Sequence, residues 1–232
     1  MISNINHSHV DAINKFLATT TGREKLCRLV QYFSRFYVFY LTRAGASKDV
    51  IKRWAELKGH IGNARKFFRL LKPIEFAQNG VKGLTLQDPV LRATTVIKQA
   101  GMFLYYTTEA INLGNLINFR KVDNIKKITT FGQKCWFVAL TASLVSGLYK
   151  FKLLAAKEAK LATSEKVDQA DAKKLAKDQF NTRYQFIQDC CDIIIPTAGL
   201  GWIGFDEGIV GIAGMITSAM AARNQWYKVN PQ

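Results

Sequence analysis

The residue types that most often carry chemistry are few in this sequence and poorly spaced for it. The histidines His7, His9 and His60 have no partners at metal-ligand spacing, and no P-loop, HExxH or GxSxG pattern occurs. Asp206 and Glu207 are adjacent carboxylates. Carboxylates at the start of a helix, however, more often complement the helix dipole and its free N–H groups than act as acid and base. We therefore assign no catalytic residue and predict that the protein is not an enzyme.

The four cysteines do not suggest a metal site either. Cys27, Cys135, Cys190 and Cys191 show no CxxC spacing and have no clustered histidines near them. This pattern favours neither a zinc site nor a secreted disulfide framework. We expect reduced thiols in the core and no metal.

One short motif resembles a dinucleotide-binding loop. Gly199, Gly201 and Gly204 match GxGxxG and follow an apolar run. Pro196 and Thr197 interrupt that run, and no Asp or Glu lies about 20 residues after the motif, where the ribose would need one. We therefore expect no nucleotide cofactor, and no cofactor of another kind.

Composition and charge point to an anionic partner. The chain has 232 residues, of which 48% are hydrophobic, and a net charge of +16. Residues 1–86 hold 15 Lys or Arg and 5 Asp or Glu, so most of the excess is N-terminal. Nucleic acid, an acidic protein surface and anionic lipid would all attract such a chain. Nearly uncharged stretches of about 15–20 residues are hard to bury in a soluble protein of this size, so we expect lipid and no nucleic acid.

Two amphipathic helices are predicted in the N-terminal part. Residues 21–43 carry a wide aromatic stripe, and Gly45 suits the turn after that helix. In residues 47–71, apolar side chains recur at three- and four-residue steps and are bordered by Lys and Arg, as in an interfacial membrane helix. The common alternative is a helix packed inside a soluble bundle. The side chains expected to insert into a membrane are Val50, Trp54, Leu57, Ile61, Phe68 and Leu71.

The basic residues around that seam are expected to contact lipid headgroups. Each Lys or Arg near an anionic leaflet contributes on the order of 1 kcal/mol, and full burial of an apolar side chain contributes about 1.5–3 kcal/mol. Together they favour stable adsorption of this segment. The expected headgroup contacts are Lys52, Arg53, Lys58, Arg65, Lys66, Arg69 and Lys72.

The middle of the chain predicts a helical hairpin. A polar link over 75–87 precedes Asp88 and Pro89, which suit an N-cap and the first turn of a helix. Residues 99–119 and 128–149 are each nearly free of charge and long enough to cross a bilayer or to form a buried core. We divide the chain into basic amphipathic helices over 1–87, the hairpin with a possible membrane span over 88–155, and a charged helical connector followed by an amphipathic helix over 156–195.

The last part, residues 196–232, predicts a glycine-rich membrane helix. Small residues let another helix approach closely in a membrane. Arg223, Trp226, Tyr227 and Lys228 then resemble an interfacial belt. A buried helix of a soluble bundle is the alternative. With the other segments this gives an all-α fold class. The glycines expected to mediate helix association are Gly204, Gly208, Gly211 and Gly214.

Both ends of the chain resemble one family. Residues 15–25 (KFLATTTGREK), 29–36 (LVQYFSRF) and 62–70 (GNARKFFRL) resemble the N-terminal signature of the peroxin-eleven family. Residues 191–196 (CDIIIP) and 206–214 (DEGIVGIAG) resemble its C-terminal signature. The middle carries no motif that we match to the family.

The resemblance implies a protein of the peroxisomal membrane that elongates it and promotes fission and proliferation. It also implies self-association into a homo-oligomer and cooperation with a dynamin-related fission GTPase and its membrane adaptor. A pore-forming channel for small metabolites is the alternative function, with Glu109 and Lys134 as charges that could line a path.

Overall fold

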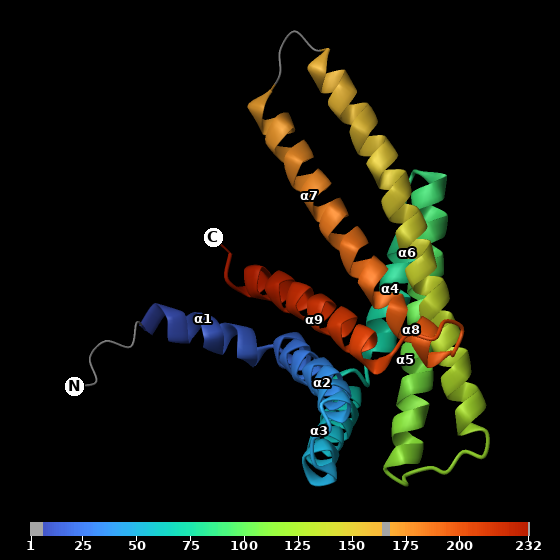
Figure 1. Ribbon diagram of the computed structural model, residues 1–232. Helices are drawn as coiled ribbons and strands as arrows, with labels where there is room; N and C mark the ends of the chain where they lie inside the picture. Colours follow the sequence, from blue (N-terminus) through green and yellow to red (C-terminus); the bar gives the residue numbers. More distant parts are fainter. Residues whose placement is uncertain (1–6, 164–167, 232) are drawn as a thin grey trace.

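The computed structural model describes residues 7–163 and 168–231, and these residues form helices and no strands. The prediction of an all-α fold is therefore confirmed for this part of the chain. Figure 1 shows the helices along the chain. They are α1 (His7–Ala18), α2 (Thr20–Arg43), α3 (Lys48–Phe68), α4 (Lys72–Leu84), α5 (Pro89–Leu116), α6 (Ile125–Ala162), α7 (Gln169–Asp192), α8 (Ile194–Gly199) and α9 (Glu207–Val229).

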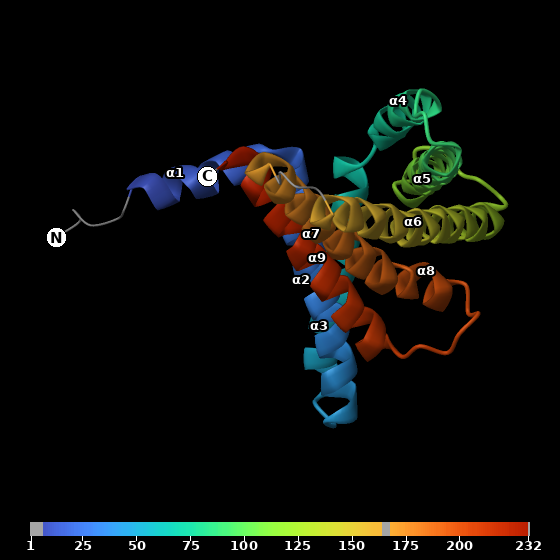
Figure 2. The same cartoon turned by 90° about the horizontal axis from the view of Figure 1, so that it is seen from above.

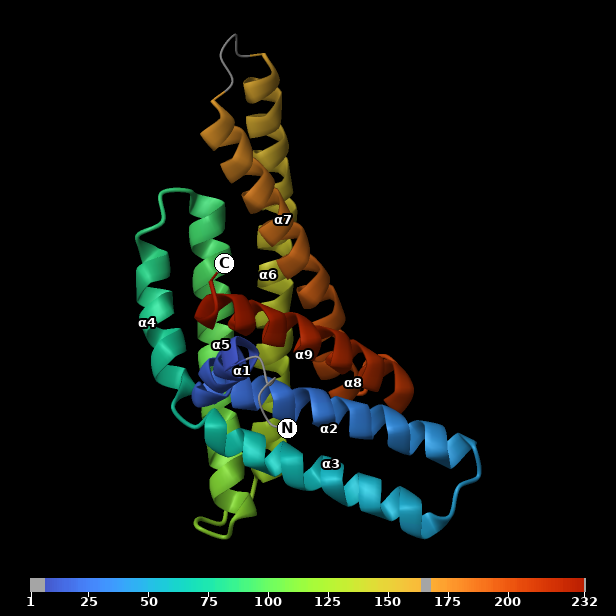
Figure 3. The same cartoon turned by 90° about the vertical axis from the view of Figure 1, so that its left-hand side faces the viewer.

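The helices lie in two groups that cross each other. Figure 3 shows α5 and α6 side by side and nearly upright, with α4 beside α5, while α2, α3 and α9 run across them. Figure 2 shows the same arrangement from above, with α7 between the crossing helices and α6. The charged N-terminal helices are thus held against the middle of the apolar hairpin.

The predicted hairpin of α5 and α6 is confirmed, and small residues let its helices approach closely. A Cβ at Gly101 would lie 2.7 Å from the carbonyl oxygen of Cys135 and 3.0 Å from the Cβ of Ala139. The amide of Asn112 also donates to the hydroxyl of Thr129 across the pair. Asp88 caps α5 by accepting from the N–H groups of the next turn, as its position before Pro89 predicts.

Two sequence-based expectations are corrected or refined by the structure, and a third is confirmed. The link expected over 75–87 is mostly helix, because α4 extends from Lys72 to Leu84. Pro73 lies in the first turn of α4, where a backbone N–H has no hydrogen-bond partner within the helix, so its absence does not destabilise the helix. The connector expected over 156–195 is divided between α6, α7 and α8, and its residues 164–167 lie outside the described part of the chain. Between α2 and α3 the chain turns at Gly45 with φ of 69°, a left-handed conformation that glycine adopts without strain.

The helix that begins the chain packs on the one that ends it. Phe16 of α1 contacts Trp226 of α9 with 5.8 Å between ring centroids. The amide of Gln225 donates to the Thr19 hydroxyl, and that of Asn230 donates to the carbonyl of Ala12. Helices α1 and α9 are therefore anchored to each other.

Candidate functional site

The predicted membrane-inserting seam of α3 is only partly available to a membrane. Trp54 packs edge-on against Phe33 and Tyr37 of α2, with ring centroids 5.9 and 4.8 Å apart. Ile61 is half-buried, while Val50 and Leu57 keep 37% and 39% of their surface exposed. The middle of the seam thus holds the α2–α3 hairpin together. Its end remains open, with Phe68 37% and Leu71 73% exposed.

The seven basic residues expected at lipid headgroups divide into two groups. Lys52 and Arg53 are exposed and remain available to an anionic surface, whereas Lys72 is 30% exposed and paired with Glu75 at 2.5 Å. The other four, Lys58, Arg65, Lys66 and Arg69, turn toward the interior of the protein. For Arg65 and Arg69 the expectation is corrected, because each is largely buried and committed to a carboxylate.

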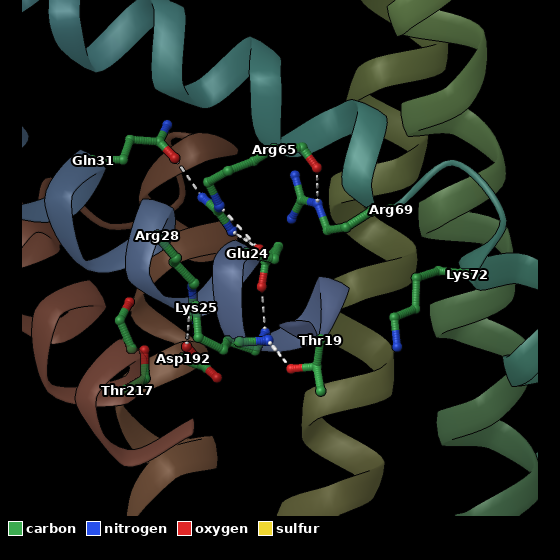
Figure 4. Close-up of polar contacts among 12 residues, drawn as sticks. Thr19, Glu24, Lys25, Arg28, Gln31, Arg65, Arg69, Lys72, Asp192 and Thr217 are labelled. Carbon is green, nitrogen blue, oxygen red and sulfur yellow. Dashed lines mark hydrogen bonds and ion pairs between the residues drawn. The ribbon is translucent and has the colours of Figure 1, made fainter. Parts of the chain in front are cut away.

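Buried ion pairs join helices far apart in the sequence (Figure 4). Arg65 of α3 donates to the carboxylate of Glu24 on α2 from two nitrogens, at 2.9 and 2.7 Å, and also to the amide oxygen of Gln31. Arg28 of α2 donates to Asp192 at the end of α7 at 2.6 Å, and only 8% and 11% of their side-chain surfaces are exposed.

Two more pairs complete this network. Arg69, just after α3, donates to Glu109 of α5 at 2.6 Å. Arg35 of α2 holds Glu207 of α9 through two hydrogen bonds of 2.7 and 2.5 Å, with Lys58 of α3 at 3.8 Å. The network ties the N-terminal hairpin to the hairpin of α5 and α6, to α7 and to α9.

The pKa shifts show that the network stabilises its charged forms. Burial raises the pKa of Glu24, but the charges of Lys25, Arg65 and Arg69 outweigh that effect and hold it well below its ordinary value. Burial lowers the pKa of Arg28, but Asp192 opposes it and leaves that pKa raised. The hydrogen bond from Arg35 lowers the pKa of Glu207 against a smaller effect of burial.

A cavity of about 650 Å³ lies inside this network, where α2 and α3 meet α5, α6 and α7. Its lining includes eight Lys or Arg side chains and five Asp or Glu side chains, an excess of three positive charges. Each helix contributes one face, at three- and four-residue steps. From α3 and the residue after it, the lining residues are Lys58, Gly59, Gly62, Asn63, Arg65, Lys66 and Arg69.

Helix α4 and its N-cap residue carry an exposed apolar face, of which the sequence reasoning found only Leu71. Leu71, Ile74, Val81 and Leu84 are 73%, 67%, 67% and 58% exposed, and their spacing places them on one side of the helix. We call these four side chains the α4 apolar face. The opposite side packs on α5. There Phe76 stacks on Tyr106 with 5.2 Å between centroids, and a Cβ at Gly83 would lie 2.9 Å from Thr95.

The signal for this face was present in the sequence as an apolar repeat at i, i+3, i+10 and i+13. Asn79, Gly80 and Gly83 concealed it, since they read as a loop when they are considered without their neighbours. The two glycines serve packing, because they bring α4 close to α5.

Three of the four predicted association glycines do bring two helices together, within one chain. A Cβ at Gly211 of α9 would lie 2.8 Å from the backbone nitrogen of Phe36 in α2, and one at Gly208 would lie 2.5 Å from the Phe39 ring. Gly214 is covered by the ring of Tyr32. Gly204 lies before α9 with open space around it, so it makes no such contact.

The described residues contain one helix that is long and apolar enough to cross a membrane. It is α6, which includes the predicted stretch 128–149. The predicted C-terminal span in α9 does not meet the same criterion, because Arg223 and the polar residues after it reduce its mean hydropathy.

The remaining candidates are the potential metal ligands, the cysteines and the two charges considered for a channel. Among the described residues no three His, Cys, Asp or Glu side chains lie close enough to hold a metal ion. The cysteines are free thiols, but Cys190 is exposed, which corrects its expected place in the core. Of the two charges considered for a channel, Glu109 is paired with Arg69 and Lys134 is exposed on α6.

Comparison with known proteins gives the family. The family model described as Peroxisomal biogenesis factor 11 (PEX11) matches residues 10–226. The chain belongs to this family. It is 28% identical to the peroxisomal membrane protein PMP27 of Saccharomyces cerevisiae, over 95% of each chain. It is 27% identical to the peroxisomal biogenesis factor 11 of Schizosaccharomyces pombe, over 91% of this chain and 92% of the relative.

The resemblance also extends beyond fungi. The human peroxisomal membrane protein 11B is 20% identical over 96% of this chain and all of its own. No solved structure matches the chain. The family description and the relatives' names refer to biogenesis and to a membrane, and none refers to a reaction. The PEX11 chain described here is thus a protein of the peroxisomal membrane, as the terminal signatures predict.

Proposed function

We propose that this PEX11 protein elongates the peroxisomal membrane by inserting α4 and the end of α3 into the cytosolic leaflet, and that this promotes fission. The observation that carries the proposal is the α4 apolar face. Exposing four large aliphatic side chains to water costs free energy, and that free energy is recovered when the side chains insert among lipid headgroups and acyl chains. Lys72 and Lys82 flank them, and Lys52 and Arg53 extend the basic border along α3.

The energies suffice for adsorption. Full burial of an aliphatic side chain contributes about 1.5–3 kcal/mol. Because roughly two thirds of each side chain in the α4 apolar face is still exposed, inserting all four contributes about 5 kcal/mol. Each flanking cation adds on the order of 1 kcal/mol at an anionic surface. Shallow insertion into one leaflet enlarges that leaflet relative to the other, which favours outward curvature and tubules.

Assembly into a homo-oligomer would concentrate the inserted helices. The glycine face of α9 is occupied by α2, so copies that meet through α9 must use its opposite face. There Ile209, Ile212 and Ile216 are each 44% exposed. We propose this isoleucine face as the contact between copies, and a dynamin-related GTPase with its membrane adaptor as the partner that severs the resulting tubules.

The test measures tubule formation by the full-length protein in anionic liposomes. Ile74→Asp with Val81→Asp places two charges in the α4 apolar face, at positions that are already exposed, so the fold is preserved. We expect tubulation to be lost. The matched control, Phe180→Asp with Ile187→Asp, changes two α7 side chains of 52% and 53% exposure and should tubulate like the unchanged protein. Undiminished tubulation by the α4 variant would refute the proposal.

Substitutions in the middle of the α3 seam are a less direct test. Trp54 and Ile61 pack inside the protein, so replacing them disturbs the α2–α3 hairpin as well as any membrane contact. The α4 positions separate the two effects.

A further inference from the structure

The charged cavity between the N-terminal hairpin and the α5–α6 hairpin has more cations than its own carboxylates can balance. Eight basic side chains face five acidic ones across about 650 Å³, a volume typical of small-ligand sites. The four arginines and Lys25 hold four of the carboxylates, Glu24, Glu109, Asp192 and Glu207. The remaining basic side chains are Lys58 and Lys66 of α3 and Lys98 of α5.

Two of these lysines have no ion-pair partner within 4 Å in the described structure. Lys66 of α3 donates only to the amide oxygen of Asn63, at the long distance of 3.4 Å. Lys98 of α5 donates to the Ser143 hydroxyl at 2.7 Å, and that hydroxyl donates to Asp189. Burial lowers the pKa of Lys66 more than Glu109 raises it, as expected for an ammonium group that lacks a counter-charge.

The fifth carboxylate is a weak counter-charge. Burial raises the pKa of Asp189 although Lys98 and its hydrogen bonds oppose the shift. The side-chain oxygens of Gln133 and Gln188, which also line the cavity, are buried without a hydrogen-bond partner. Excess charge and unpaired polar groups in a partly enclosed space are costly unless a ligand or water satisfies them.

We propose that this cavity binds a small polyanion carrying phosphate groups, held by Lys66 of α3 and Lys98 of α5, which both line the cavity with the arginine pairs. A phosphate-bearing ligand offers several acceptor oxygens and at least two negative charges, which matches the excess of cations. Its protonated or hydroxyl groups would donate to the two glutamine oxygens. The same chemistry occurs in free phosphate compounds and in phosphorylated lipid headgroups. The inference does not depend on insertion of α4 into a membrane.

The experiment uses purified full-length protein in a neutral detergent, titrated with inorganic pyrophosphate in a calorimeter. In a second arm the protein is mixed with phosphatidylcholine vesicles with and without a few per cent of phosphatidylinositol 4-phosphate. Saturable binding of pyrophosphate in the first arm would identify the ligand as a free phosphate compound. Binding only to the vesicles that contain the phosphorylated lipid would identify the ligand as a lipid headgroup. Binding in neither arm overturns the proposal.

Matched variants separate the cavity from the charged surface. Lys66→Met with Lys98→Met removes two cations that are not in ion pairs, so no carboxylate loses an ion-pair partner. We expect this double variant to bind the ligand at least roughly tenfold more weakly. Lys126→Met with Lys127→Met removes the same charge from the exposed first turn of α6 and should change binding less than about twofold. Equal weakening by both pairs would show adsorption to the surface and overturn the site.

A third variant tests the site without changing charge. Gly59 lines the cavity at its exposed edge, and a Cβ there would meet nothing within 4 Å. Gly59→Leu favours the helix and fills part of the opening. We expect it to weaken ligand binding, whereas Gly114→Leu, at a helical glycine on α5 with equally open surroundings, should leave binding unchanged. Full binding by Gly59→Leu together with full binding by Lys66→Met and Lys98→Met would exclude the cavity.

Discussion

Removing the carboxylate of Asp192 should destabilise the protein far more than removing that of Glu207, although each holds an arginine of α2. Asp192 and Arg28 are 11% and 8% exposed at their side chains, whereas Glu207 and Arg35 are 52% and 25% exposed. Asp192→Ala leaves the guanidinium of Arg28 buried without a counter-charge, which costs about 3–5 kcal/mol. Glu207→Ala breaks a solvent-screened pair that contributes about 0–1 kcal/mol.

Thermal unfolding in detergent, followed by far-ultraviolet circular dichroism, measures this difference. For a chain of this size 1 kcal/mol corresponds to about 2–4 °C in Tm, so Asp192→Ala should lower Tm by roughly 6–20 °C and Glu207→Ala by less than about 4 °C. The double variant Arg28→Met with Asp192→Leu removes both charges and should recover most of the loss, since apolar side chains of similar volume can replace a buried pair.

Two results would refute the reasoning. Equal shifts for the two single variants would mean that Arg28 reaches water, so that burial does not govern the pair. A double variant that is no more stable than Asp192→Ala would mean that the loss comes from packing at the α2–α7 contact rather than from an unpaired charge.

Three further outcomes follow from the same contacts. Gly211→Leu should lower Tm by several degrees and separate α9 from α2, because the new side chain would meet the backbone of Phe36. Such overpacking costs about 1–3 kcal/mol or more. An unchanged Tm would show that the two helices can move apart without loss of stability. Because the folded pKa of Glu24 is depressed, its pairing with Arg65 stabilises the protein fully above its ordinary pKa of 4.5 and is lost as pH falls below that value. The Tm difference between the unchanged protein and Glu24→Gln should therefore shrink on acidification, and a constant difference would contradict the shift. Trp54→Ala should cost about 3–5 kcal/mol by opening the α2–α3 hairpin, measurable as a lower Tm, whereas a purely lipid-facing Trp54 would leave Tm in detergent unchanged.

Much of the helical plan follows from the sequence alone. Apolar periodicity and capping residues are local, so they indicated helices at α2, α3, α5 and α6 and the caps at Asp88 and Asp206. The terminal signatures likewise indicated the family. The same local reasoning failed at α4, because Gly80 and Gly83 resemble a loop unless the helix they pack against is known.

The roles of the basic residues were decided only by the tertiary structure. Arg53 and Arg65 both border the apolar seam of α3, on its two sides, yet one is exposed and the other is buried against a carboxylate 41 residues away in sequence. Similarly, Arg28 depends on Asp192, 164 residues away. The sequence determines how many charges a helix carries and on which face. Whether a charge meets water, lipid or a counter-ion depends on desolvation and Coulomb energies, and these are fixed only when distant helices pack together.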